Sequence, residues 1–315
     1  MKKNFNIIFM GTPEFALPAL KALHKTRHHL SLVVTQPDHP RGRGRKVLPT
    51  PVKKTAQALG YDVIQPISVR TVDFKERIAG LQPDLIVAAA FGHILPKALL
   101  DLPRIGTINI HASLLPKYRG PSPIQWALIN REKYTGVTII LVDEGLDTGD
   151  ILLSEKVEIA DNDTSATLHD RLSVLGADLM LKTLNNFASG SISPVHQDHD
   201  KATYTSLLKK KDGQIDWKMA ANSLDAFIRG MTPWPGAFTF CGNKRLKILK
   251  AKPVSKEVDH TPGTVIAGFP DELLVAAGKG CISILEIQAA SGKRLLIKDF
   301  LQGCSIPPGT VLLGR

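Results

Sequence analysis

The first half of the chain alternates short apolar runs with stretches of helical spacing. The apolar runs predict strands at residues 6–10, 30–35, 62–64, 84–90, 107–111 and 137–142. After Pro13 the apolar residues recur at roughly helical intervals, and proline is tolerated in a first helical turn. Continuous apolar strands that alternate with helices are typical of a mostly parallel sheet with helices on both faces. We therefore predict an α/β fold with a doubly wound sheet.

The second half of the chain has a different pattern. A helix of about 20 residues is predicted from Ser165, because the leucines from 168 to 179 recur at spacings of four, three and four. A helical stretch at 220–229 and short β-like runs follow, at 237–240, 246–251, 264–267, 273–276, 281–287 and 309–313. This spacing is typical of a small barrel or sandwich. In a chain of 315 residues we expect two domains, 1–188 and 206–315, with a linker at 189–205.

The charge of the chain is positive and uneven. The net charge is +11, with 24 basic and 20 acidic residues up to Thr205, but 16 basic and nine acidic residues after it. A strongly basic region favours a polyanionic partner, most simply nucleic acid. A soluble surface that is merely basic is the alternative.

Several classes of protein are disfavoured. No apolar stretch reaches the roughly 18 residues of a membrane helix, and the N-terminal run is too short for a signal peptide. Cys241, Cys281 and Cys304 form neither a CxxC pair nor a disulfide framework. The glycine fingerprints of dinucleotide and P-loop sites are missing, and the histidine clusters lack further metal ligands. We expect a cytoplasmic protein that needs no metal ion.

Two polar residues lie at the end of the strand predicted at 107–111. Asn109 and His111 are two residues apart, so their side chains share one face of the strand. Open α/β sheets bind ligands beyond the carboxyl ends of their strands. Burying two polar side chains in an apolar strand costs free energy unless they are hydrogen-bonded or take part in the protein's function. We interpret the pair as candidate site residues, with a hydrogen-bonded core histidine as the alternative.

A second polar cluster follows the strand predicted at 137–142. The segment 143–150 is rich in carboxylates, and Asp147 precedes a Thr-Gly pair that suits a residue fixed by the backbone. If the two strands are neighbours, a carboxylate of this segment reaches His111 at the carboxyl edge of the sheet. A charged turn, and a Mg²⁺ site built from several carboxylates, are the alternatives.

An asparagine, a histidine and an aspartate that converge on one cleft suit formyl or acyl transfer to an amine. The asparagine amide donates to the oxyanion of a tetrahedral intermediate, and the histidine donates or shuttles a proton. The aspartate orients the imidazole and favours its protonated form. No serine or cysteine nucleophile is required, and none lies in a nucleophile elbow.

The segment 36–54 carries six basic residues and follows the second predicted strand. Glycines beside arginines predict a flexible cationic arm, whose guanidinium groups bind phosphates with defined geometry. We therefore expect RNA contact near the carboxyl edge of the sheet. A solvated mobile loop is the alternative.

These motifs resemble those of the methionyl-tRNA formyltransferases, a family of folate-dependent formyltransferases, over nearly the whole chain. The similar segments are 9–16, 36–53, 91–96, 113–116, 147–150 and 232–236. The resemblance identifies Asn109, His111 and Asp147 as catalytic residues. It implies folate contacts from Phe91, Gly92, Ile94, Leu95, Ser113, Leu114, Leu115 and Pro116, and tRNA contacts from Arg41, Arg43, Arg45 and Lys46. His93 departs from the family, which commonly has an apolar residue there.

The resemblance also implies a Rossmann-like catalytic domain and a C-terminal barrel similar to an OB fold. The expected reaction moves the formyl group of 10-formyltetrahydrofolate to the α-amino group of initiator methionyl-tRNA. Asn109 and His111 stabilise the tetrahedral intermediate, with support from Asp147. The expected partners are this tRNA and folate, without a membrane, and we expect a monomer.

Two other functions share parts of this pattern. A formyltransferase for an amino sugar nucleotide has the same trio and two domains, but its small acceptor needs no basic arm. A non-catalytic RNA-binding protein on the same scaffold does not need the trio, so the presence of all three residues argues against it.

Overall fold

The computed structural model describes residues 4–41, 46–256, 259–268 and 270–315. The chain forms two compact units that alternate along the sequence. The first unit comprises Met1–Gly120, Thr135–Glu158 and His169–Thr205, and the second comprises Pro121–Tyr134, Ile159–Leu168 and Ser206–Arg315. The segment 189–205, which we expected to be a linker, lies within the first unit.

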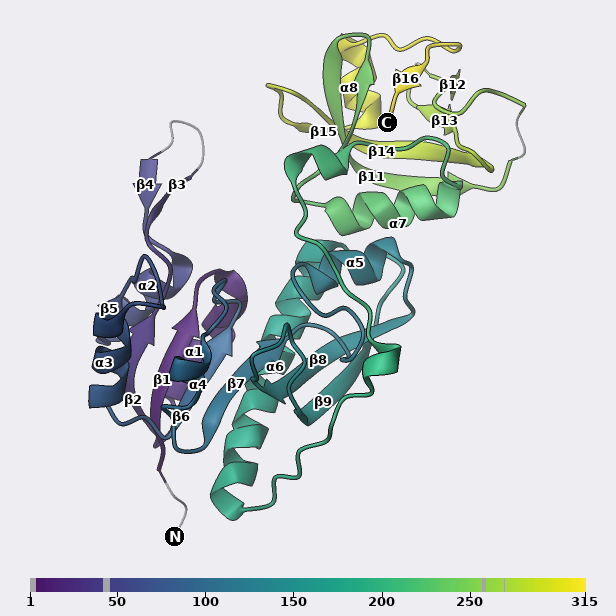
Figure 1. Cartoon of the computed structure of the whole chain (residues 1–315). Helices are drawn as coiled ribbons and strands as arrows, with labels where there is room; N and C mark the ends of the chain where they lie inside the picture. Colours follow the sequence, from purple (N-terminus) through teal and green to yellow (C-terminus); the bar gives the residue numbers. More distant parts are fainter. Residues whose placement is uncertain (1–3, 42–45, 257–258, 269) are drawn as a thin grey trace. The chain divides into compact units, whose positions relative to one another are not determined.

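The first unit is built on one seven-stranded sheet with the order β5-β2-β1-β6-β7-β8-β9. Its strands are β1 (Asn6–Gly11), β2 (His29–Val34), β5 (Val63–Ile64), β6 (Leu85–Ala89), β7 (Gly106–His111), β8 (Tyr134–Leu141) and β9 (Ile151–Glu158). Neighbouring strands among β5, β2, β1, β6 and β7 pair in parallel, whereas β8 pairs with β7 antiparallel. The predicted α/β class with a mostly parallel sheet is confirmed (Figure 1).

The helices of the first unit form where the sequence supplies caps and apolar faces. They are α1 (Leu17–His24), α2 (Pro51–Ala58), α3 (Val72–Gly80), α4 (Lys97–Leu100) and α6 (Ser165–Ser189), of which the residues up to Leu168 belong to the second unit. The Thr50 and Thr71 side chains accept backbone N–H groups at the starts of α2 and α3, which stabilises these helix ends. The predicted helix from Ser165 is present, with Leu168 and Leu172 buried. None of the helices within the described ranges is long and apolar enough to span a membrane.

The basic segment 36–54 contains more regular structure than the sequence indicated. A strand β3 (His39–Arg41) pairs antiparallel with β4 (Lys46–Leu48), and α2 begins at Pro51. At the base of this hairpin the Asp38 carboxylate accepts hydrogen bonds from Lys53 Nζ at 2.6 Å and from Gln65 Nε2 at 2.5 Å. The hairpin is therefore tied to α2 and to the end of β5.

These contacts at Asp38 predict a pH-dependent contribution to stability. The Lys53 ammonium, and then the Gln65 amide, hold the pKa of Asp38 below its usual value. A carboxyl whose pKa is lower in the folded state stabilises the fold above its unfolded pKa of about 3.9, and this stabilisation disappears as the pH falls through the folded pKa. We expect Asp38→Asn to lower the free energy of unfolding by about 1 kcal/mol at pH 7 and by much less at pH 3.

Urea unfolding of both proteins at the two pH values measures this difference. Asp101→Asn is the matched control, because its ion pair with Lys97 is mostly exposed and we expect a smaller effect. An equal loss of stability at pH 7 and pH 3 would contradict the assignment of Asp38 as a charged partner of Lys53.

The second unit is built on an antiparallel sheet with the order β12-β13-β14-β11-β10-β16, in which β15 also pairs with β14. The strands are β10 (Ala237–Cys241), β11 (Lys244–Val254), β12 (Val265–Ala267), β13 (Leu274–Ala276), β14 (Cys281–Ala289), β15 (Arg294–Leu296) and β16 (Leu312–Leu313). The two ends of this order meet, because Val265 N–H donates to Thr310 O and Leu312 N–H donates to Gly263 O, each at 2.8 Å. The predicted small barrel is confirmed as a nearly closed, barrel-like sheet.

Within the described residues, α-helices complete the second unit. They are α5 (Pro123–Ile129), α7 (Ala221–Met231) and α8 (Ile297–Gly303). Helices α5 and α7 approach closely at Gly230, where a Cβ would lie 2.7 Å from the Ile129 side chain. Trp217, Phe227 and Ile284 belong to a buried apolar core under the sheet. The sequence did not indicate β15 or α8, since all three residues of β15 are exposed and show no alternation.

Candidate active site

Strand β7 carries both polar residues singled out by the sequence. His111 is 6% exposed and is the last residue of the strand, and Asn109 is half-buried. By the alternation of side chains along a strand, Asn109 and His111 share a face with Thr107. The predicted placement of the pair on one face at the end of a strand agrees with the structure.

Asp147 reaches this face by a route that the sequence did not indicate. We expected β8 to run parallel to β7, but the two strands are antiparallel, with Ile108 opposite Leu141 and His111 opposite Thr138. The chain therefore leaves β8 near the start of β7, and the loop after Leu141 must fold back. Leu141 N–H donates to Asp150 O at 2.9 Å, and a Cβ on Gly149 would lie 1.7 Å from Leu141 O. Only glycine permits this close return, which directs Asp147 towards β7.

The three side chains converge. Asp147 Oδ1 accepts a hydrogen bond from Asn109 Nδ2 at 3.4 Å, and Asp147 Oδ2 lies 3.6 Å from His111 Nδ1. The Gly120 N–H donates to the same Oδ2 at 2.8 Å. The predicted proximity of a carboxylate to His111 is thus present, and the carboxylate is that of Asp147.

The tautomer of His111 follows from its other contact. His111 Nε2 lies 2.9 Å from the carbonyl oxygen of Tyr118. A carbonyl oxygen only accepts, so Nε2 carries a proton, and Nδ1 is the atom that faces Asp147. The imidazole is therefore held at Nε2, with its opposite nitrogen facing the carboxylate.

The arrangement brings an amide donor and an imidazole on one face of β7 together with a carboxylate from the loop after β8. Such a set can donate to an oxygen that develops negative charge and can move a proton at a neighbouring nitrogen. Among the residues that the structure describes there is no group of three or more histidine, cysteine or acidic side chains that could hold a metal ion.

The residues expected to contact folate fall into two segments. In the first, Phe91 and Leu95 are buried in the core near β6, Gly92 has a φ of +85°, and Ile94 is 65% exposed. In the second, Ser113 and Leu115 are buried, whereas Leu114 and Pro116 are half-buried. Thr138 Oγ1 donates to Ser113 O at 2.7 Å and accepts from Leu115 N–H at 3.2 Å, which fixes the turn after His111. Both segments thus have members buried within the first unit.

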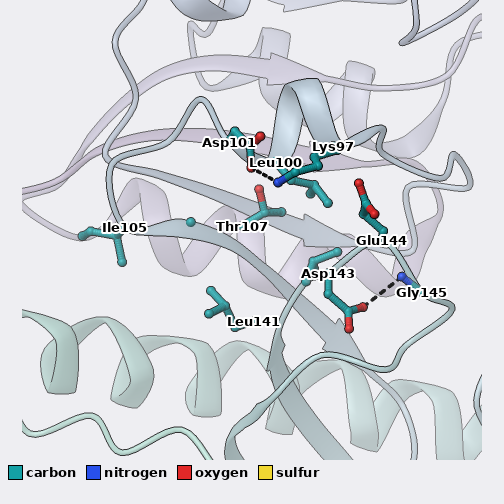
Figure 2. A pocket seen from close by; sticks show the side chains of 11 residues that line it. Lys97, Leu100, Asp101, Ile105, Thr107, Leu141, Asp143, Glu144 and Gly145 are labelled. Atoms are coloured by element: carbon teal, nitrogen blue, oxygen red, sulfur yellow. Dashed lines mark hydrogen bonds and ion pairs between the residues drawn. The ribbon is translucent and has the colours of Figure 1, made fainter.

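A pocket of about 480 Å³ lies at the start of β7 (Figure 2). It is lined by Lys97, Leu100, Asp101, Ile105, Gly106, Thr107, Leu141, Val142, Asp143, Glu144 and Gly145. Asp143 accepts hydrogen bonds from Gly145 N–H and Thr148 Oγ1, which orders the loop that leads to Asp147. The buried Thr107 Oγ1 has no hydrogen-bond partner within the described residues.

Sequence reasoning missed this pocket. Its residues come from three separate segments with no common pattern. One signal was present, because Thr107 stands two residues before Asn109 and so lies on the same strand face.

The residues expected to contact tRNA are only partly described. Arg43 and Arg45 lie outside the described residues. The backbones of Arg41 and Lys46 form the facing ends of β3 and β4.

Comparison with known proteins identifies the family. Residues 3–184 match the family described as Formyl transferase, and residues 207–305 match Formyl transferase, C-terminal domain. A methionyl-tRNA formyltransferase of Citrifermentans bemidjiense is 47% identical over 306 residues, which cover 97% of this chain and 96% of that relative.

Solved structures share the fold. The N-formyltransferase from Helicobacter canadensis, in complex with folinic acid and dTDP-3-aminofucose, has a TM-score of 0.67 at 19% identity and covers 92% of this chain and 99% of that one. HypX from Aquifex aeolicus, in complex with tetrahydrofolic acid, has a TM-score of 0.64 at 19% identity over 95% of this chain, which spans 47% of HypX. Because of the match at residues 3–184 and the 47% identity to a relative of nearly equal length, the chain belongs to the formyl transferase family and, within it, to the methionyl-tRNA formyltransferases.

Proposed function

We propose that this chain transfers the formyl group of 10-formyltetrahydrofolate to the α-amino group of initiator methionyl-tRNA. The observation that carries the proposal is the convergence of Asn109, His111 and Asp147 at one end of β7 in a member of this family. The full-length relative of the same name supports the choice of both substrates.

The reaction needs formation of a bond, cleavage of a bond and movement of a proton, and the trio serves the first and the last of these. The amine nitrogen attacks the formyl carbon, a C–N bond forms, and the formyl oxygen becomes an oxyanion. Asn109 donates to this oxygen, and His111 stabilises its charge. The bond between the formyl carbon and N10 of the folate then breaks. One proton leaves the amine and one is taken up by N10, so charge and atoms balance. Asp147 orients His111 and assists the movement of the proton.

We assign the folate donor to the pocket at the start of β7, together with the segments 91–95 and 113–116. Thr107 and Asn109 are about 7 Å apart along the strand, given the usual rise of a strand residue. A ligand that fills the pocket therefore extends towards Asn109 along one face. The unpartnered Thr107 hydroxyl supports a polar ligand, since a buried polar group without a partner is costly.

Thr107→Val tests this assignment. The two side chains have nearly the same shape, so the change removes one hydroxyl. We expect the KM for the folate donor to rise about 3- to 10-fold and kcat to change little, since a neutral hydrogen bond contributes about 0.5–1.5 kcal/mol. Steady-state kinetics with varied donor concentration measures both constants.

Thr183→Val is the matched control, because this buried hydroxyl donates to Leu179 O within α6 and does not line the pocket. A donor KM that is the same in Thr107→Val and in the parent protein would overturn the assignment of the pocket.

The acceptor tRNA is assigned to the basic segment and to the second unit. Arg41, Arg43, Arg45 and Lys46 are proposed to hold the acceptor end. Residues 206–315, with 16 basic and nine acidic residues, are proposed to bind the tRNA backbone. We keep 1–188 and 206–315 as the proposed functional domains, and a monomer in the cytoplasm as the proposed state.

Formyl transfer from 10-formyltetrahydrofolate to charged initiator tRNA by the purified protein is the decisive assay. We expect elongator methionyl-tRNA to be a poor acceptor. The KM for tRNA should rise steeply with salt concentration, and Arg43→Ala should reduce this salt dependence. Salt-insensitive formylation of an amino sugar nucleotide would favour the sugar enzyme instead. tRNA binding without any formyl transfer would indicate a non-catalytic RNA-binding protein.

A further inference from the structure

The Arg119 side chain is deeply buried and pairs with neutral groups. It is 1% exposed. Its guanidinium donates to Gln197 Oε1, to the Tyr204 hydroxyl at 3.2 Å and to His199 Nδ1 at 3.1 Å. Burying a charge is costly, and neutral partners recover less of the cost than a carboxylate does. The position of this guanidinium therefore calls for an explanation beyond stability.

Gln197 joins this guanidinium to the loop that carries Asp147. Its Oε1 accepts two hydrogen bonds from Arg119, from Nε at 3.1 Å and from Nη2 at 2.7 Å. Its Nε2 donates to Asp147 O at 2.8 Å and to Gly149 O at 2.7 Å. Gln197 is 5% exposed, and its bonds to Arg119 and to Gly149 O are buried, whereas the bond to Asp147 O is partly buried.

The backbone beside Arg119 contacts the trio from the other side. The Gly120 N–H donates to Asp147 Oδ2 at 2.8 Å, and Tyr118 O accepts from His111 Nε2 at 2.9 Å. Arg119 itself is held by Thr203 and Thr205, since its N–H donates to Thr203 O and its O accepts from Thr205 N–H, each at 2.8 Å. Both His111 and Asp147 are thus connected to the same three-residue segment.

Asp147 needs such support. Its φ is +53°, in the left-handed region, which costs an ordinary residue free energy unless the surroundings hold it. The Asp147 backbone oxygen and carboxylate are each bound by a group connected to Arg119.

We infer that Arg119 and Gln197 are positioning residues for the formyl transfer, which hold Asp147 at its distance from Asn109 and His111. This inference rests on the proposed function. The Gln197 amide donates to the backbone oxygen of Asp147, and the Arg119 guanidinium donates to Gln197, Tyr204 and His199. Gln197 acts through the backbone of the loop 147–149, and Arg119 acts through Gln197 and through its own neighbours in the chain.

Gln197→Glu separates positioning from folding. A glutamate still accepts both Arg119 hydrogen bonds, with added charge attraction, so the buried guanidinium keeps its partner. It cannot donate to Asp147 O and Gly149 O, and instead directs a carboxylate oxygen at two carbonyl oxygens. The substitution therefore removes the hydrogen bonds that hold the loop 147–149, but keeps the buried contact between position 197 and Arg119.

We expect Gln197→Glu to lower kcat about 10- to 100-fold, because a displacement of about 1 Å at a reacting group has this order of effect. The KM values for folate donor and tRNA should stay within about twofold, since neither substrate is assigned to Gln197. The pH dependence of kcat should also change, because the Asp147 carboxylate no longer lies at its place beside His111. A purely structural role predicts loss of folded protein with an unchanged pH dependence and kcat per folded molecule.

His196→Ala is the matched control, since this neighbouring side chain is 93% exposed in its ion pair with Asp150 and we expect parental kinetics. A kcat per folded molecule of Gln197→Glu within twofold of the parent, with an unchanged pH dependence, would overturn the inference. If Gln197→Glu does not fold, Arg119→Lys is tested by the same criteria. This substitution keeps the positive charge but removes the planar guanidinium that makes two hydrogen bonds to Gln197 Oε1. Failure of the parent protein to formylate tRNA would overturn the proposed function instead.

Discussion

Asp147→Asn is expected to lower kcat by about 1,000-fold or more. The carboxylate accepts from two donors at once, from Gly120 N–H on Oδ2 and from Asn109 Nδ2 on Oδ1. An amide has one oxygen, so its NH₂ group must face one of these N–H donors. The substitution also removes the negative charge that lies 3.6 Å from His111 Nδ1. Orientation of the imidazole and the electrostatic balance of the site are lost together.

Single-turnover formylation with both substrates saturating measures this effect without interference from product release. Asp150→Asn is the control in the same loop, because the Asp150 carboxylate pairs with the exposed His196 and we expect a change of less than about threefold. An Asp147→Asn protein that folds normally and keeps more than a tenth of the parental rate would contradict the role assigned to Asp147.

The sequence predicted the elements whose burial is continuous. All five residues of β6 are buried, and such a run is recognisable without knowledge of its neighbours. The sequence did not predict the direction of β8, because an apolar run has the same pattern in a parallel strand and in an antiparallel strand. Only the pairing in the folded chain, with Ile108 opposite Leu141 and His111 opposite Thr138, reveals the direction.

The same contrast applies to the site. Asn109 and His111 could be paired from sequence alone, since their separation of two residues on one strand determines a shared face. Gln197 could not be found in this way. It lies about 50 residues after Asp147 in a polar segment without periodicity, and only the folded chain brings its amide to the backbone of Asp147. A local pattern encodes local geometry, whereas a contact across the fold leaves no comparable signal.

Asn109→Ala is expected to lower kcat about 100- to 1,000-fold, equivalent to about 3–4 kcal/mol of lost transition-state stabilisation. In the proposed mechanism the amide donates at the oxygen that becomes an oxyanion, so its contribution grows as the tetrahedral intermediate forms. The KM for either substrate should change much less than kcat, as expected for an interaction made mainly in the transition state.

Asn109→Asp tests whether Asn109 acts as a hydrogen-bond donor. Aspartate has nearly the shape of asparagine but offers no N–H, and it would bring a second carboxylate to Asp147, whose Oδ1 lies 3.4 Å from the present Asn109 Nδ2. If Asn109 acts as a donor, Asn109→Asp is at least as slow as Asn109→Ala. A rate of Asn109→Asp above that of Asn109→Ala would show that Asn109 only fills space beside Asp147, and would contradict the assignment as an oxyanion donor. Asn162→Ala, at an exposed position, controls for loss of an asparagine as such.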